Sequence, residues 1–147
     1  MNRNYTVTTT IARPVAEVFD AVVSKEKLAK YFVDDANGDI VEGAELRWRW
    51  NHYHATLPAS VKKVDAQRYI ELTLSSKAWE KTTIDDYPVA TIFEFAALDD
   101  NNCTLAISEA GWKTDTEGLK GSHDNCGGWM HMAMCLKAWI EHGIHLR

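Results

Sequence analysis

Hydrophobic and polar residues alternate with a period of two along most of this chain, which is the pattern of strands with one buried face. The alternation is strictest over residues 46–50, where Leu46, Trp48 and Trp50 share one face and two arginines occupy the other. The same pattern predicts further strands over residues 5–11, 54–64, 69–76, 89–98 and 103–110, and a short one over 39–41. Short turns join them, so neighbouring strands are expected to pair antiparallel.

Two short helices are predicted directly after the first strand. Pro14 suits the first turn of a helix, where its missing N–H costs nothing, and apolar residues then recur at helical spacing over residues 15–22. Ser24 can cap a second helix over residues 25–31, because its hydroxyl can accept a hydrogen bond from a free backbone N–H.

A long helix is predicted over residues 127–142, with Gly143 as its stop. Residues 113–121 have no apolar periodicity and are expected to form a loop. The apolar stripe of the helix is too wide for a flat contact surface, so a sheet that curls around the helix would cover it. We therefore predict an α+β fold, with a curved antiparallel sheet around a long C-terminal helix, as a single domain over residues 1–147.

Composition narrows the function classes without selecting one. The chain has 147 residues, 46% of them hydrophobic, and a net charge of −5. It has no basic patch for nucleic acid or an anionic membrane, and its longest apolar run, Met132 to Leu136, is far too short to span a bilayer. We expect neither partner. Three cysteines without a CxxC pair and no signal peptide fit reduced thiols, so a cytoplasmic location is expected.

Several segments resemble, in order, those of one known family. They are IARPVAEVFDAV at residues 11–22, LAKYF at 28–32, Gly43 before the tryptophan-rich strand, Arg68-Tyr69-Ile70, TLAISEAGW at 104–112, and Gly128-Trp129 with LKAWIEHG at 136–143. The family is the START-like (SRPBCC) helix-grip superfamily. More narrowly, the chain resembles homologues of the activator of the 90-kDa heat-shock protein's ATPase, of the single-domain bacterial type. Tyr31 replaces the tryptophan that usually precedes Phe32.

The resemblance implies a fold in which a curved sheet grips the last helix and leaves an apolar cavity between them. It also implies a hydrophobic small molecule as ligand, or a chaperone partner in a stress response. The candidate cavity residues are Trp48, Trp50, Phe93, Phe95, Ile107, Glu109, Trp112, Trp129, Met130, Ala133 and Met134. Aromatic and methionine side chains suit irregular apolar ligands, but the alternative is that they simply fill the core.

Ionisable candidates for chemistry are few. Glu109 shares strand parity with Leu105 and Ile107, so it is expected to point inward, where a carboxylate can act as a general acid or base. The alternative is a strand-end residue that twists into solvent. His123 with Cys126 and His131 with Cys135 could contribute to a zinc site only if the fold brought three or four ligands together. We predict no catalytic residue, no metal and no cofactor.

Three functions remain open from the sequence. The first is a ligand-binding domain, which predicts a closed apolar cavity. The second is an interaction module that binds a chaperone or a second copy of itself, which predicts an exposed apolar or charged face such as that of Arg47 and Arg49. The third is a cavity enzyme of the cyclase, hydrolase or dehydratase kind, which predicts Glu109 and a histidine converging on one space.

Overall fold

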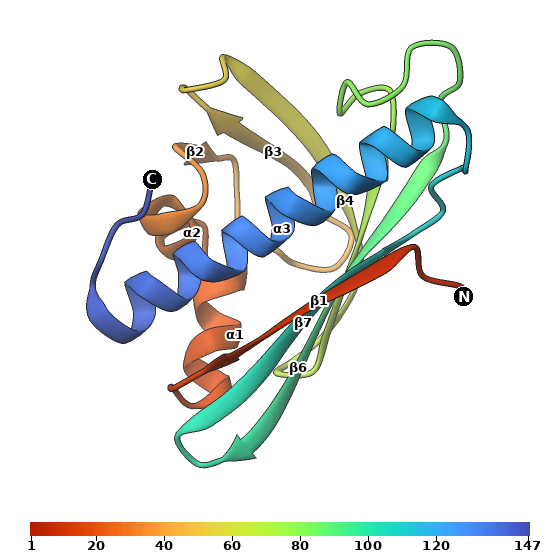
Figure 1. The fold of residues 1–147 in the computed structure, drawn as a ribbon. Coiled ribbons are helices and arrows are strands. Elements are labelled where there is room, and N and C mark those ends of the chain that lie inside the picture. The colour runs from red at the N-terminus through yellow and green to blue at the C-terminus, as the bar shows by residue number, and fades with distance from the viewer.

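One antiparallel sheet and three helices account for most of the chain, and the computed structural model describes all residues 1–147. Along the chain the elements are β1 (Tyr5–Ile11), α1 (Val15–Val23), α2 (Lys25–Tyr31), β2 (Asp35–Ala36), β3 (Glu45–Trp50), β4 (Ala55–Asp65), β5 (Tyr69–Ser75), β6 (Pro88–Asp99), β7 (Asn102–Ala110) and α3 (Thr116–His142). The order of the seven strands in the sheet is β1-β7-β6-β5-β4-β3-β2, so the first strand pairs with the last (Figure 1).

The alternating pattern predicts the buried face of the sheet correctly. In β3, Leu46, Trp48 and Trp50 are buried, while Arg47 and Arg49 are exposed. The β6–β7 hairpin closes at the predicted turn, where Asp99 pairs with Asn102. The six main predicted strands are therefore confirmed, with ends that differ by at most one residue.

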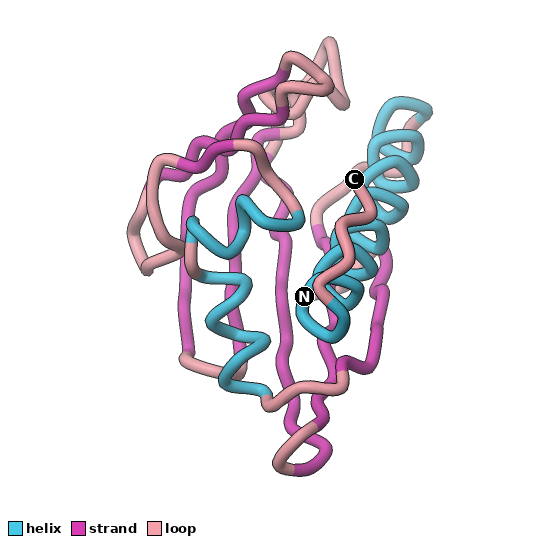
Figure 2. The backbone as a smooth tube through the Cα atoms, turned by 90° about the vertical axis from the view of Figure 1, so that its left-hand side faces the viewer, coloured by secondary structure: helices cyan, strands magenta, loops and turns pink.

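The helices gather against one face of the sheet, as the wide apolar stripe of the last helix predicts (Figures 1 and 2). The buried core joins α1, α2, the inner face of the sheet and α3 in one apolar cluster. Within it, α3 packs most closely against β1 and also contacts β7 and α2, and α1 and α2 lie beside its C-terminal part. This is the predicted helix-grip arrangement.

The last helix begins at Thr116, not at Gly127, so the loop predicted over residues 113–121 is confirmed only for residues 113–115 and is wrong from residue 116 onward. The Asp115 side chain accepts a hydrogen bond from the Gly118 N–H at 2.8 Å and caps the helix. The two early glycines are explained by close packing: a Cβ at Gly118 would lie 2.1 Å from the Lys113 carbonyl oxygen, and one at Gly121 would lie 2.7 Å from the Trp112 ring. Glycine here permits close approach and does not break the helix.

The short strand also lies elsewhere than predicted, at residues 35–36 and not at 39–41. The Asn37 side chain explains the shift, because its amide donates to the Glu45 carbonyl and its oxygen accepts from the Arg47 N–H. These bonds tie the chain to the edge of β3 just after β2, and Ile40 then turns inward. None of the three helices is both long and apolar enough to cross a membrane.

Candidate functional site

A groove of about 870 Å³ opens between one side of α3 and the end of the sheet that carries the β3–β4 turn. We call it the α3 groove. Its wall consists of Lys30, Tyr31, Phe32, Asp34, Trp50, His52, Tyr53, Ala55, Leu57, Trp79, Glu80, Lys81, Asp124, Asn125, Gly128, Trp129, His131, Met132, Cys135, His145, Leu146 and Arg147. Tyr53 and Leu146 are 70% and 52% exposed. The space is therefore an open groove, whereas the ligand-binding reading predicted a closed cavity.

Aromatic rings line the inner part of the groove. Phe32, which follows α2, lies with its ring centroid 5.2 Å from that of Trp50 and 5.6 Å from that of Trp129. The Trp129 ring in turn lies 6.0 Å from Trp79 and 5.5 Å from Phe93. These are ordinary spacings for edge-to-face and tilted aromatic pairs, so the rings support one another as a preformed apolar surface.

The indole N–H groups of this surface are already used inside the protein. Trp50 donates to the Phe32 carbonyl at 2.7 Å, and Trp79 donates to the Pro58 carbonyl at 2.6 Å. Trp129 donates to a carboxylate oxygen of Glu109 at 3.0 Å. The three tryptophans can therefore offer ring surface to a ligand, but no hydrogen-bond donor.

Glu109 is the most heavily hydrogen-bonded side chain in the protein, and it is 0% exposed. It lies near the end of β7 and points inward, as its strand parity predicts; the alternative, in which it turns to solvent, is wrong. Five side chains donate to its two oxygens: Tyr5 (2.6 Å), Trp112 (2.8 Å), Thr91 (2.6 Å), Asn125 (3.3 Å) and Trp129 (3.0 Å).

The chemistry of these donors fits an ionised carboxylate. An indole N–H can only donate, and a carboxylate can only accept. Burial, together with the neighbouring Glu109 carboxylate, raises the pKa of Tyr5, which keeps its hydroxyl available as a donor. The cluster links β1, β6, β7 and α3 at one point. The two Glu109 oxygens already accept five hydrogen bonds, so this arrangement is better suited to holding α3 against the sheet than to accepting a proton. No histidine is among the partners of Glu109.

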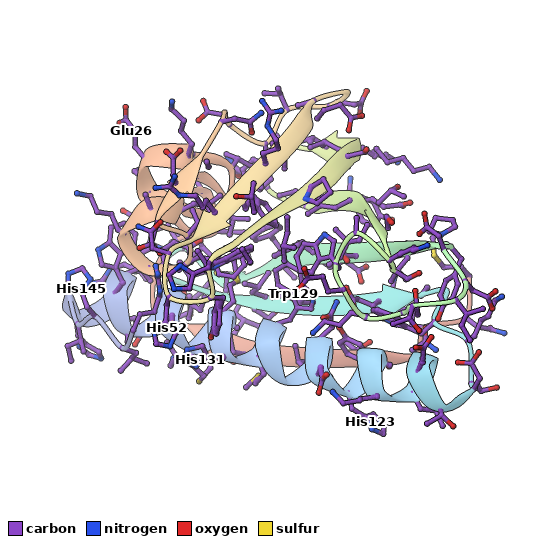
Figure 3. The ribbon with its side chains drawn as sticks, turned by 90° about the horizontal axis from the view of Figure 1, so that it is seen from above. Glu26, His52, His123, Trp129, His131 and His145 are labelled. Carbon is purple, nitrogen blue, oxygen red and sulfur yellow. The ribbon has the colours of Figure 1, made fainter.

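Polar groups occupy the end of the groove near the C-terminus. His52, His131 and His145 lie at this end, whereas His123 projects from the outer side of α3 (Figure 3). The Cys135 sulfur lies 3.5 Å from His131 Nε2, one helical turn away, and burial raises the pKa of the Cys135 thiol.

The segment after α3 forms one wall of this end. His145 Nδ1 lies 3.1 Å from the Lys30 carbonyl oxygen, and Arg147 forms an ion pair with Asp34 at 3.1 Å. The Asn51 N–H also donates to Asp34, and these interactions, that of Asn51 foremost, lower the pKa of the Asp34 carboxyl. The groove is thus apolar within and charged at its mouth.

The candidate cavity residues divide between the groove and its surroundings. Trp50 and Trp129 line it. Five others are buried in the core: Trp48, Phe93, Phe95, Ile107 and Ala133. Glu109 and Trp112 belong to the hydrogen-bonded cluster around the Glu109 carboxylate. Met130 and Met134 are only partly buried and lie outside the groove wall, whereas Met132 is buried and lines it. Ligand contact by any of these residues stays a prediction.

Several groove residues escaped the sequence analysis. Asn125 was missed because the helix was started too late: with α3 beginning at Thr116, Asn125 lies one turn before Trp129 on the same face. Phe32 was noted only as part of the LAKYF segment. Trp79 follows β5 in a loop, where no periodicity indicates its direction. No three His, Cys, Asp or Glu side chains lie close enough together to hold a metal ion.

Comparison with known proteins gives a family match over most of the chain. Residues 12–141 match the sequence profile of the family described as "Activator of Hsp90 ATPase homolog 1-like protein". A comparison with curated proteins finds no match.

Solved structures share the fold at low sequence identity. A protein from Staphylococcus saprophyticus, SSP2350, is 21% identical with a TM-score of 0.74 over 97% of this chain and 96% of that chain. The Aha1 dimer from Colwellia psychrerythraea is 17% identical with a TM-score of 0.76, over 97% and 98% of the two chains. DynU16, titled a putative protein in the dynemicin biosynthetic locus, is 15% identical with a TM-score of 0.76, over 94% of this chain and 47% of that chain.

Proposed function

The chain belongs to the Activator of Hsp90 ATPase homolog 1-like family, and on that premise we propose that it binds an apolar, aromatic-sized small molecule in the α3 groove. The observation that carries the proposal is the aromatic wall, in which three tryptophan rings face one space with their N–H groups already bonded elsewhere. The groove volume of about 870 Å³ lies within the usual range of small-molecule sites.

Gly128 supports this proposal independently. It lies in the middle of α3, where glycine costs about 1 kcal/mol relative to alanine. A Cβ at Gly128 would have no atom within 4 Å, so packing does not require a glycine there. Gly128 lines the groove, and the absence of a side chain keeps one wall clear for a ligand.

Gly127 provides a matched control for the experiment. A Cβ at Gly127 would also have no atom within 4 Å, but Gly127 does not line the groove. Gly128→Leu and Gly127→Leu therefore gain the same helix propensity, and only the first places a side chain in the groove wall.

The test is a titration of each variant with 2-methoxynaphthalene, followed by the indole N–H resonances in NMR spectra. We expect shifts at Trp50, Trp79 and Trp129 in the unmodified protein and in Gly127→Leu. In Gly128→Leu the affinity should fall by about tenfold or more, which corresponds to about 1.4 kcal/mol. Equal binding by both variants, or no shift at these tryptophans in any of them, would refute the proposal.

Association with a second copy is the alternative that has a specific observation in its favour. The Colwellia relative is described as a dimer, and Tyr53 and Leu146 are exposed apolar side chains at the groove mouth. Sedimentation of the full chain over a range of concentrations tests it. A dimer that Tyr53→Ser dissociates would support contact through this mouth, whereas a monomer at all concentrations would exclude it.

A further inference from the structure

We infer that the α3 groove selects ligands that carry a hydrogen-bond donor, such as a phenolic hydroxyl, and that the side-chain oxygen of Asn125 is the acceptor that selects them. The inference deepens the proposed function and rests on it, because it concerns the same groove. It names a chemical class of ligand and the residue that distinguishes that class from apolar molecules of similar shape.

Glu109 fixes the orientation of the Asn125 amide. Asn125 Nδ2 lies 3.3 Å from Glu109 Oε2, and the carboxylate can only accept hydrogen bonds. If the amide were reversed, its oxygen would face the carboxylate oxygen, and neither atom could donate. The NH2 group therefore points toward Glu109, and the oxygen must point the other way.

The Asn125 oxygen has no partner within the protein. The one hydrogen bond of this side chain is the one that its NH2 group donates to Glu109. Asn125 is 5% exposed and lines the groove. The buried side-chain polar atoms that lack a partner are Trp48 Nε1 and Ser108 Oγ, so Asn125 Oδ1 is not sealed in the core. The oxygen therefore keeps some accessible surface, and the groove that Asn125 lines is the space into which we infer that it points.

The neighbours of Asn125 make this acceptor different from the others in the groove. Trp129 lies one helical turn away and contributes an aromatic ring, and Gly128 leaves the wall between them open. The carboxylates of Asp34, Glu80 and Asp124 stand at the exposed mouth, where water competes for them. A ligand on the aromatic wall would displace water from Asn125 but not from these groups.

The Asn125 oxygen can discriminate between ligands because a bound ligand displaces the water that solvates it. A ligand with a hydroxyl at this point replaces the lost water bond, whereas one without a donor leaves the oxygen desolvated and unpaired. A site built to hydrogen-bond a ligand group discriminates against the analogue that lacks it.

The experiment compares 2-naphthol with 2-methoxynaphthalene, in which a methyl group replaces the hydroxyl hydrogen and removes the donor, on the full chain. We expect the unmodified protein to prefer 2-naphthol by about fivefold, the factor that one neutral hydrogen bond supplies. Asn125→Leu, of similar size but without an acceptor, should lose this preference through weaker binding of 2-naphthol. His123→Leu, two residues earlier but on the outer side of α3 and not part of the groove wall, should retain it.

Each outcome has a distinct meaning. If neither probe binds the unmodified protein, the proposed function fails together with the inference. If both bind with equal affinity, the groove binds ligands but the inference is overturned, and this result needs no variant. If Asn125→Leu keeps the preference, another group is the selector and the inference is also overturned. If Asn125→Leu does not fold, the preference of the unmodified protein, with a shift of the Asn125 side-chain NH2 resonances by 2-naphthol alone, decides the matter.

Discussion

Helix α3 contains two pairs of glycines whose surroundings are opposite. At Gly118 and Gly121 an added Cβ would collide with the Lys113 carbonyl and the Trp112 ring, at 2.1 and 2.7 Å. At Gly127 and Gly128 it would meet nothing within 4 Å. The first pair lets the start of the helix approach its neighbours closely. The second pair leaves space beside the helix. Glycine therefore permits tight packing in the first region of α3 and leaves an open surface in the second.

The polar groups around α3 also differ between its tightly packed side and its open side. On the sealed side, where α3 faces β7, Glu109 accepts five hydrogen bonds and no water reaches it. On the open side, the oxygen of Asn125 has no partner, and the charged groups of the mouth are exposed. The sealed side stabilises the position of the helix, and the open side is left free to bind.

The largest loss of stability is expected from a substitution that disrupts the hydrogen bonds of Glu109 on the sealed side. Glu109→Gln replaces two acceptor oxygens by one and places an NH2 group among five donors, so several buried donors lose their partner. We expect a loss of about 3–5 kcal/mol in the free energy of unfolding. Urea titration followed by tryptophan fluorescence measures it.

Glu94→Gln is the matched control, on the neighbouring strand. Its side chain is 40% exposed and pairs only with Arg3 at the surface. The change should cost less than about 1 kcal/mol. Equal losses in the two variants would contradict the view that Glu109 clamps the helix to the sheet.

The next largest changes in stability are expected from alanine substitutions that compare the two glycine pairs. Gly118→Ala forces a methyl group against the Lys113 backbone and should destabilise the protein by about 2–3 kcal/mol. Gly127→Ala has room for the methyl group and should stabilise the protein by about 1 kcal/mol, because alanine favours the helix. Thermal unfolding of both variants gives the two signs. Changes of the same sign would show that the surroundings of the two pairs do not differ as described.

A smaller effect is expected at the start of the helix. Asp115→Ala removes the side chain that accepts from the Gly118 N–H, so we expect a loss of about 1 kcal/mol. Asp100→Ala, in the β6–β7 turn, is the control, because no cap depends on it. A neutral result for Asp115→Ala would favour a helix that starts later, closer to Gly127.

The smallest expected effect is a pH-dependent loosening of residues 144–147, which form part of the groove wall on the open side. The Asn51 N–H and Arg147 lower the pKa of Asp34 below its unfolded value of about 3.9. A carboxyl with a lowered pKa in the folded state contributes its stabilisation above the unfolded pKa and loses it as the pH falls through the folded one. We therefore expect these residues to loosen below about pH 4.

Amide exchange of residues 144–147 as a function of pH measures this change. Asp34→Asn should show the loosened state already at neutral pH, without a further change on acidification. A tail that stays protected in Asp34→Asn would mean that the ion pair with Arg147 does not hold it.

Most of the sheet followed from the sequence because period-two alternation is a local property. Leu46, Trp48 and Trp50 are buried as a set, since a strand has only two faces and one of them carries arginines. The beginning of α3 did not follow, because glycines at positions 118 and 121 locally disfavour a helix, and only their contacts with Lys113 and Trp112 explain them.

The candidate site was predictable only in part. Trp50 and Trp129 could be chosen as apolar aromatics on a strand and a helix that face each other. Phe32 and Trp79 lie in connecting segments, which have no period to indicate where a side chain points. Asn125 was hidden by the late start assigned to the helix, although its spacing of four residues before Trp129 was present in the chain.

The sequence by itself determined the alternating strands, the two short helices that follow β1, the α+β class and the inward direction of Glu109, because each depends on a period or a cap of a few residues. The tertiary structure alone decided that the tryptophans border an open groove and that five side chains, from residues 5 to 129, meet at one carboxylate. Those outcomes depend on how far the sheet curves around α3, and that is set by packing between segments distant in the chain.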